Sequence, residues 1–433
     1  MRPTASLAAA AFLALALLPA AAPIPAGAAT PCPEPTPAAS PAPGDLLLMP
    51  EDARITLFDE VWGAIDAGYL DDSFNGTDWA AIGDEYAPYF LQLESADEVW
   101  DLAREMLELL GDDEVFFTDA LAYEAIQPAE TDYVGIGALV DGDRAEEEGL
   151  GPRILYLFPG GGAEEAGLAP RDRIVSVDGD PCVSVGKIRG PEGTTVELGI
   201  ARPGEGERTV VVERRRIDPV IRPVMRRIGM DDSIGYLRLD SLEGEELYAA
   251  LEEALTDFAE DPVTGIVLDV RSTNVGAPGV TLGLLSHLME GDAGALYSRA
   301  ESAPIELLDS DLVGRLGALP VVVLVDEGSI GEAERLALIL QAAGRATVIG
   351  APTEGRTRTI RDLPLSDGSY LSLPTIGLEL PGGRRLMREG VVPDVPIAED
   401  WLAVPEADDP GILAAVAAIE AVDGGGAPAA SAP

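Results

Sequence analysis

The chain has 433 residues and an extreme excess of acid, with 76 Asp and Glu against 29 Lys and Arg and a formal net charge of −47. Such a surface repels phosphate backbones and anionic lipids, so nucleic acids and membrane surfaces are excluded as partners. The length is sufficient for two or three domains with cores of their own. The acids are spread along the chain, which is typical of a solvated acidic surface and leaves basic peptides and cations open as partners.

The beginning of the chain has the features of an export signal. Arg2 precedes an apolar segment at 7–22, and Ala26-Gly27-Ala28 offers a small-x-small cleavage site. Residues 1–28 are therefore predicted to be a secretory signal peptide, with an uncleaved N-terminal anchor as the alternative. No other segment is long and apolar enough to span a membrane, so we expect an exported protein, periplasmic or extracellular. A Pro/Ala-rich linker follows at 29–50.

Residues 51–125 are predicted to form a helical domain. Apolar residues recur near helical spacing between Ile55 and Tyr69. A second helix is predicted to begin at Ser95 as N-cap, with Glu98 three residues later, and to stop at Gly111.

The next segment, 126–217, changes to short apolar runs separated by glycine turns, which favours a small β-rich domain. It is followed at 218–400 by alternating strands and helices, which indicate an α/β core with a mostly parallel, covered sheet. The strand candidates are 233–239, 265–271, 320–325, 346–350 and 370–380, and the helix candidates are 245–260, 279–290 and 331–343. Residues 366–369 have the composition of a hairpin turn. A final helix at 409–421 and a flexible tail make up most of residues 401–433.

Metal chemistry has little support in the composition. His287 is the only histidine, and two cysteines, Cys32 and Cys182, cannot complete a structural zinc site. Whether these cysteines form a disulfide is left open, because one of them lies in a Pro-rich segment. The acidic stretch Asp141–Glu148 raises the alternative of a cation-responsive surface protein, but no loop has EF-hand spacing. We expect no metal and no cofactor.

The stretch 320–356 has the pattern of a buried strand, a turn at Gly328-Ser329-Ile330-Gly331, a helix, a second strand and a glycine-bounded loop. The continuous run Val321–Val325 is typical of a strand covered on both faces. A turn of small residues between strand and helix is a common place for a nucleophile, because the helix N-terminus offers free N–H groups to an oxyanion.

Most of the chain resembles the tail-specific (C-terminal processing) serine peptidases. The similar motifs include FNGTDW, EMLELLGD, IGYLRLDSL, IVLDVR, LPLSDGSYLSL and GGRRLMREGVVPDV, and they occur in the family's order. Within 126–217, YVGIGA and PGGGAEEAGLAPRDRIVSVDG resemble a PDZ domain. The resemblance implies an N-terminal helical segment, an inserted β-rich PDZ-like domain and an α/β crotonase-like (ClpP/crotonase-type) core.

The same resemblance implies a Ser nucleophile in a G-[ST]-A-S-A-S-E turn and a Lys general base in a T-F-G-K-G loop. The positions that match these residues are Gly331 and Arg356. Glycine has no nucleophile, and a guanidinium does not release its proton at working pH. Because Lys187, the only lysine, belongs to the PDZ-like segment, the core cannot contain a Ser–Lys dyad. His287 is interpreted as a core residue of its helix rather than a base.

Ser329 is the fallback nucleophile, but it comes two residues early and needs a base. The carboxylates of Glu327, Glu332 and Glu334 would oppose a developing oxyanion beside it. The favoured interpretation is that Ser329 helps to cap the helix, while Arg356 pairs with one of these carboxylates.

Two further regions of the family pattern are altered. The glycine loop after the central strand is shifted, so the oxyanion-hole region falls on Asn274, Gly276 and Glu332. In the PDZ-like segment, the loop of Gly135, Ile136 and Gly137 is predicted to receive a polypeptide C-terminus through its backbone. Only eight residues, 180–187, stand where the family has a groove helix, so a structural spacer is an equal interpretation.

These observations predict an exported, non-catalytic homologue that binds or scaffolds polypeptides, such as polypeptide C-termini or basic peptides. The first alternative is an active serine endopeptidase that uses Ser329. The second is the acidic, cation-responsive surface protein.

Overall fold

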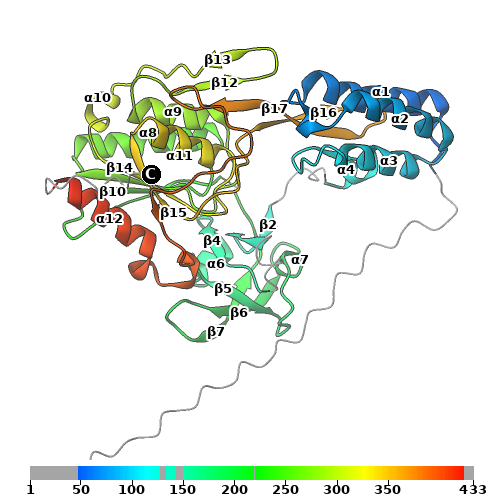
Figure 1. Ribbon diagram of the computed structural model, residues 1–433. Coiled ribbons are helices and arrows are strands. Elements are labelled where there is room, and N and C mark those ends of the chain that lie inside the picture. Colours follow the sequence, from blue (N-terminus) through cyan, green and yellow to red (C-terminus); the bar gives the residue numbers. More distant parts are fainter. Residues whose placement is uncertain (1–46, 127–132, 143–149, 219, 424–433) are drawn as a thin grey trace, which may run out of the picture. The chain divides into compact units, whose positions relative to one another are not determined.

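The computed structural model describes residues 47–126, 133–142, 150–218 and 220–423 (Figure 1). The predicted signal peptide, most of the predicted linker, the C-terminal tail and Cys32 lie outside the described residues. Within the described part of the chain, no helix is long and apolar enough to cross a membrane.

The N-terminal region is helical, as predicted. Its helices and strand are α1 (Glu51–Gly68), the short η1 (Phe74–Gly76), α2 (Trp79–Gln92), α3 (Ala96–Glu108), β1 (Phe116–Thr118) and α4 (Ala120–Ile126). Helix α2 was not predicted; its N-cap is Asp78, whose side chain accepts the N–H of Ala81 at 3.0 Å. Ser95 has the N-cap position of α3, but its side chain makes no capping hydrogen bond, so that part of the prediction is wrong.

A long hairpin from later in the sequence completes the core of this helical region. It consists of β16 (Thr359–Pro364) and β17 (Tyr370–Glu379), and its turn at 366–369 confirms the predicted hairpin. Strand β17 pairs with β1 near one end and with β12 (Ala295–Tyr297) near the other. Leu371 and Leu373 of β17 are buried among the N-terminal helices. One strand therefore belongs to two hydrophobic cores, which no local sequence pattern indicates.

The β-rich module, defined here as residues 133–216 that the structure describes, has short antiparallel strands. They are β2 (Val134–Gly135), β3 (Ala138–Val140), β4 (Ile154–Leu157), β5 (Arg173–Val177), β6 (Thr195–Ala201), β7 (Glu207–Glu213) and β8 (Arg215–Arg216). Two four-residue helices accompany them, α6 (Gly162–Glu165) and α7 (Val185–Ile188). Strands β5, β6 and β7 form one sheet, while β2 pairs with β8 and β3 with β4.

The α/β core contains a six-stranded sheet in the order β18-β15-β14-β11-β10-β9. Five strands run parallel, and β9 joins the edge antiparallel, which confirms the predicted parallel sheet. The strands are β9 (Val224–Ile228), β10 (Ile234–Arg238), β11 (Gly265–Asp269), β14 (Val321–Val325), β15 (Ala346–Gly350) and β18 (Val395–Pro396). Strand β13 (Ser302–Pro304) pairs with β12, and the short helix α10 (Val313–Leu316) precedes β14.

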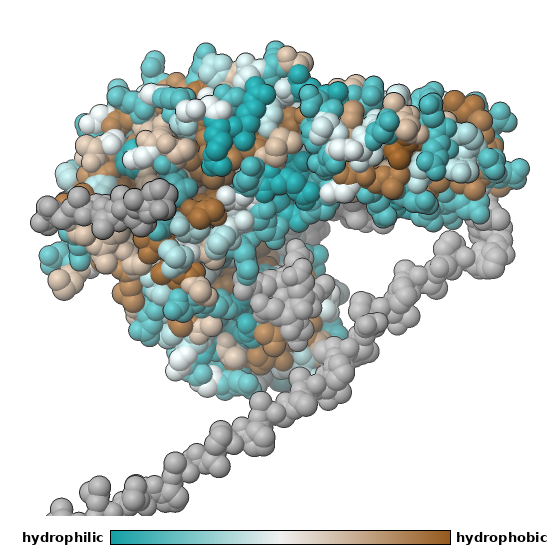
Figure 2. Space-filling model, in the orientation of Figure 1, coloured by the Kyte–Doolittle hydropathy of each residue, from teal (hydrophilic) through white to brown (hydrophobic). Residues whose placement is uncertain are grey.

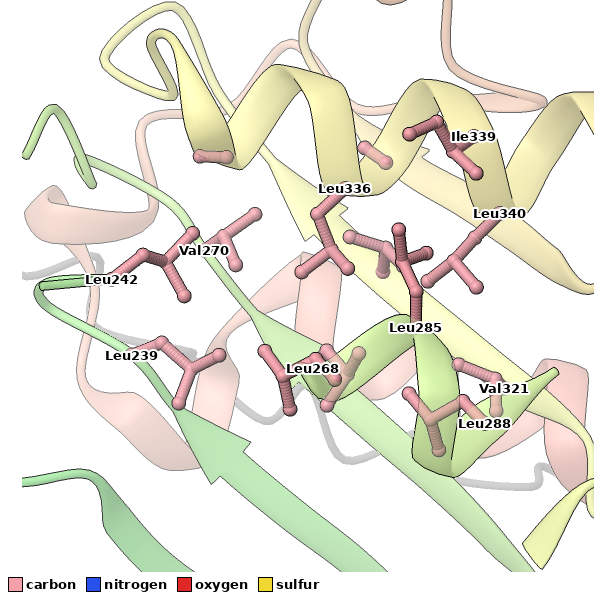
Figure 3. Close-up of a cluster of buried hydrophobic side chains, with 14 of the residues drawn as sticks. Leu239, Leu242, Leu268, Val270, Leu285, Leu288, Val321, Leu336, Ile339 and Leu340 are labelled. Atoms are coloured by element: carbon pink, nitrogen blue, oxygen red, sulfur yellow. The ribbon is translucent and has the colours of Figure 1, made fainter. Parts of the chain in front are cut away.

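Helices cover both faces of this sheet, as a parallel sheet requires. One face packs against α8 (Glu245–Glu260), α9 (Pro278–Leu288) and α11 (Glu332–Ala342), and the other packs against α12 (Pro410–Asp423) (Figure 1). Figure 3 shows Leu336, Ile339 and Leu340 of α11 directed toward Leu285 and Leu288 of α9 and the strands beneath. An apolar cluster therefore packs between α11, α9 and the sheet.

Many of the scarce cations lie inside the molecule. Among the residues that the structure describes, eight arginines are buried: Arg54, Arg153, Arg171, Arg214, Arg238, Arg271, Arg335 and Arg358. Hydrophilic residues spread over much of the face shown in Figure 2, with hydrophobic residues in small groups between them. Nine carboxylates of the described residues are buried as well, so the interior charges nearly balance and the exterior keeps the acidic excess of the composition.

The contact between α8 and α9 depends on Gly283. A Cβ atom at this position would lie 2.0 Å from Tyr248 Cε2, whereas a Cβ at Gly279 on the same helix would meet no atom within 4 Å. We therefore expect Gly283→Ala to destabilise the protein by about 1–3 kcal/mol through overpacking. Gly279→Ala should be neutral or stabilising by up to about 1 kcal/mol. Chemical denaturation of both variants tests this; equal effects would contradict the close approach.

A buried ion-pair cluster joins the N-terminal region to β16. Arg358 donates to both oxygens of Asp112, at 2.6 and 2.7 Å, and to Glu114 at 2.6 Å, while the Tyr69 hydroxyl donates to Asp112 at 2.6 Å. Burial alone would raise the pKa of Asp112, but the hydrogen bonds from Arg358 and Tyr69 hold it below its ordinary value of 3.8. Burial raises the pKa of Glu114, although Arg358 opposes the change.

This cluster predicts a pH-dependent stability. Because its folded pKa is lowered, Asp112 contributes stability above pH 3.8, and the contribution is lost as the pH falls through the folded pKa. At pH 7 we expect Asp112→Asn to cost about 3–5 kcal/mol, the typical effect of breaking a buried ion pair. The difference in free energy of unfolding between the variant and the wild type should become smaller below pH 4. Denaturant titrations at pH 3–7 measure it, with Asp113→Asn as an exposed control expected to change stability by at most about 1 kcal/mol. A pH-independent gap would contradict the assignment.

Candidate functional site

In the turn between β14 and α11, the predicted nucleophile position carries no side chain. Gly331 is the N-cap of α11, with φ 66° and ψ −111°, a conformation that side-chain-bearing residues rarely adopt. A Cβ built on it would have only the Arg356 carbonyl oxygen nearby, at 4.0 Å. The turn therefore has open space for a side chain on the side that faces the predicted base position.

Ser329 does not face that space. Its side chain is fully buried, and its hydroxyl donates to the carbonyl of Val270 at 2.9 Å and accepts the N–H of Asp326 at 3.0 Å. These bonds fix the end of β14 against the end of β11. The predicted helix cap is therefore wrong, because the hydroxyl bonds backward to the strands rather than forward to α11.

Glu334 connects the turn to the loop that carries the base position. Its carboxylate is completely buried and accepts the N–H of Gly331 at 3.1 Å, the N–H of Gly355 at 2.7 Å and the hydroxyl of Thr353. A buried carboxylate is stabilised by such donors. The sequence indicates Glu334 only as a charge beside Ser329; in the structure its carboxylate joins two loops.

The predicted oxyanion-hole region carries a carboxylate. Glu332 is the first residue of α11, only 9% exposed, and pairs with Arg335 at 2.8 Å. A Cβ at Gly276 would lie 2.6 Å from Glu332 Cβ, so the glycine backbone and the acidic side chain pack together. Asn274 and Gly276 are exposed. The structure thus brings Asn274, Gly276 and Glu332 to one region, with negative charge where an oxyanion would need donors.

Arg356 occupies the base position as a paired, half-exposed cation. Its Nε donates to Glu354 at 2.7 Å, and an Nη atom lies 3.5 Å from Asp113. The hydrogen bond to Glu354 raises the pKa of Arg356 above its ordinary value. Glu332 and Glu334 are held by other groups, so the predicted pairing of Arg356 with either of them is wrong.

The other candidate bases are engaged elsewhere. Lys187 lies on α7 of the β-rich module, and its ammonium binds Asp180 at 2.7 Å. His287 is buried on α9, with Nδ1 2.6 Å from the Ser310 hydroxyl and Nε2 3.3 Å from the Tyr248 hydroxyl. Burial lowers the pKa of His287, and Glu252 offsets this only in part. Its predicted place in the core of the helix is confirmed.

The loop of Gly135, Ile136 and Gly137 lies within the module's own packing. Ile136 is 4% exposed, and its carbonyl accepts the N–H of Ala163 at 2.7 Å. Gly137, at φ 82°, packs on Gly161 so closely that a Cβ would lie 2.7 Å from its Cα. Strand β3 follows and pairs with β4. The segment 180–187, short in sequence, contains only the single-turn helix α7 as a groove wall.

In the part of the chain that the structure describes, no group of three or more His, Cys, Asp or Glu side chains is placed to hold a metal ion. Most of the acidic stretch 141–148 lies outside the described residues.

Two residues near the turn escaped the sequence-based prediction. Asp326 follows β14, and its carboxylate accepts bonds from Ser272, Gly328, Ser329 and the indole of Trp401. Arg335 donates to the Thr357 carbonyl at 2.7 Å and the Thr359 hydroxyl at 2.6 Å, joining α11 to β16. Their only sequence signal is a charged residue within or just after an otherwise apolar run.

Comparison with known proteins agrees with this architecture. Residues 233–397 match the model of peptidase family S41, and residues 50–108 match that of the tricorn protease C1 domain. The chain is 28% identical to the chloroplastic C-terminal processing peptidase of Tetradesmus obliquus, covering 80% of this chain and 78% of that protein. It is 26% identical to the carboxyl-terminal-processing protease of Synechocystis sp., covering 88% of each.

The fold is similar to that of a solved structure, a photosystem II D1 C-terminal processing protease. The TM-score is 0.55 at 27% identity, over 84% of this chain and 96% of that one. The mixed α/β fold with N-terminal helices is thus shared with that protease. From its family match, its relatives and its fold, the chain is a homologue of the C-terminal processing peptidases of family S41.

Proposed function

We propose that this chain is an exported, catalytically silent homologue of the C-terminal processing peptidases that binds polypeptides without cleaving them. The observation that carries the proposal is Gly331. The resemblance to the family puts the nucleophile at this position, and the backbone there keeps a strained turn with room for a side chain. Without a hydroxyl, no acyl-enzyme can form at this residue.

The base position supports the same conclusion. A general base must accept the serine proton, and Arg356 holds its own proton more firmly because of Glu354. The only lysine binds Asp180 on the β-rich module, and the only histidine is bonded to Ser310 and Tyr248. Neither group is in contact with Gly331 or Ser329.

The charge at the turn also argues against catalysis. Glu332 places a carboxylate against Gly276, where a tetrahedral intermediate would need hydrogen-bond donors. Arg335 compensates this charge within the protein. The alternative of an active endopeptidase that uses Ser329 has little support, because that hydroxyl is buried and bonded to Val270 and Asp326.

Binding, in contrast, requires no nucleophile or base. It requires only the folded backbone that surrounds the turn, which we propose is a crotonase-type core. Glu334 still holds the turn against the loop at 353–355. The relatives named above process polypeptide C-termini by name, and this chain's acidic exterior favours basic segments in such polypeptides. Export rests on the signal-peptide pattern of residues 1–28.

Restoring the missing chemistry tests the proposal. We expect the wild type to leave an unfolded polypeptide such as casein intact and to give no labelling with a fluorophosphonate probe. The triple variant Gly331→Ser, Glu332→Ala, Arg356→Lys returns the nucleophile and base and removes the opposing charge. It should label at position 331 and cleave slowly.

The matched control is Ser329→Ala in the wild-type chain. Under the proposal, this change affects stability and leaves the absence of cleavage unaltered. Wild-type cleavage, or probe labelling that disappears in Ser329→Ala, would refute the proposal and restore the endopeptidase reading.

A further inference from the structure

Arg171 has a backbone conformation that its side chain does not favour. It lies in the β-rich module just before β5 at φ 75°, in the left-handed region where glycine is the ordinary residue. Its side chain is nevertheless only 6% exposed. A residue kept in a strained conformation calls for a compensating contact, and here the contact lies outside the module.

The Arg171 guanidinium reaches a segment more than two hundred residues later. It donates to the carbonyls of Trp401 at 2.7 Å and Val404 at 3.1 Å, and to the carboxylate of Asp409 at 2.7 Å. It also lies 5.1 Å from the centre of the Trp401 ring. Residues 400–409, called the strap below, have only two short 3-10 helices, at Trp401–Ala403 and Glu406–Asp408.

A second set of contacts fixes the strap to the same module. Arg153, only 1% exposed, donates to Asp400 of the strap and to Asp141 of the module at 2.8 Å. Leu402 and Trp401 pack against Leu155, next to this pair. The module therefore holds the strap through two buried arginines and an apolar contact.

The other side of the strap is fixed to the α/β core. Asp409 accepts bonds from Arg271 at 3.1 and 3.0 Å, and Arg271 follows β11. The Trp401 indole donates to Asp326 at 2.8 Å, at the end of β14. Its ring also lies 4.6 Å from the Arg238 guanidinium and 4.2 Å from that of Arg271, which adds cation–π attraction in a buried setting.

We infer that residues 400–409 are a strap that locks the β-rich module onto the α/β core, and that Arg171 closes the lock. Trp401 and Asp409 contact both the module and the core, with Asp409 shared directly by Arg171 and Arg271, whereas Asp400 and Val404 bind the module. The lock fixes the orientation of the module beside the turn that ends at Gly331, through Asp326. A polypeptide would thus meet one preformed arrangement of module and core.

Arg171→Gly is the decisive variant, because it separates two possible roles of Arg171: a residue that only forms a turn, and a residue that holds the strap. If Arg171 is only a turn residue, glycine relieves the backbone strain, and stability is unchanged or raised. If Arg171 closes the lock, the strap loses three hydrogen bonds. Amide hydrogen exchange of residues 400–409 should then become at least about tenfold faster. Small-angle scattering should show a broader distribution of intramolecular distances, because the module would no longer keep one orientation on the core.

The control is Asp232→Gly, which removes another left-handed side chain, at φ 51°, without touching the strap. It should leave exchange in residues 400–409 unchanged. Asp400→Asn is a second test. It keeps a side-chain oxygen that can accept the Leu402 N–H, as Asp400 does, and it weakens the ion pair with Arg153, so it should also speed strap exchange. Unaltered strap exchange in both Arg171→Gly and Asp400→Asn would overturn the inference.

Discussion

The buried carboxylate of Glu334 is the interaction on which the candidate site depends. It binds the N–H groups of Gly331 and Gly355 and the hydroxyl of Thr353, so it fixes both the turn and the loop. Two of its three donors are backbone N–H groups, so these bonds do not use a side chain of residue 331 or 355. The bonds of Glu334 that join the turn to the loop therefore do not require a serine at residue 331 or a lysine at residue 356.

The interior of this acidic protein depends on arginine. Arg153, Arg171, Arg271, Arg335 and Arg358 are all buried, and each bonds to at least one carboxylate. A guanidinium offers five donors in a rigid plane, so it can bind two partners at once where an ammonium could not hold the same geometry. Buried arginines and buried carboxylates occur together because each buried charge requires a partner, while the excess of acid lies on the surface.

The sequence predicted local features well and long-range contacts poorly. The apolar run of β14 and the helix α11 follow from period and turn composition, and Gly331 and Arg356 follow from the resemblance to the family. The burial of Ser329 could not be predicted, because it depends on the carbonyl of Val270 on another strand. The contact of Arg171 with Asp409 spans 238 residues. Such contacts follow from the packing of the whole chain, and single-sequence patterns carry no signal for them.

Gly331 and Arg171 both have a positive φ, but the first has no side chain and the second has a buried one. Gly331 has the strained turn conformation without a side chain, so the turn bears none of the cost that a serine would impose there. Arg171 keeps its side chain in a left-handed conformation, and its buried contacts with the strap offset the strain. At Arg171, buried side-chain contacts therefore accompany the strained backbone. At the turn, Gly331 has no side chain to make such contacts, and glycine adopts this positive φ at less cost than a serine would.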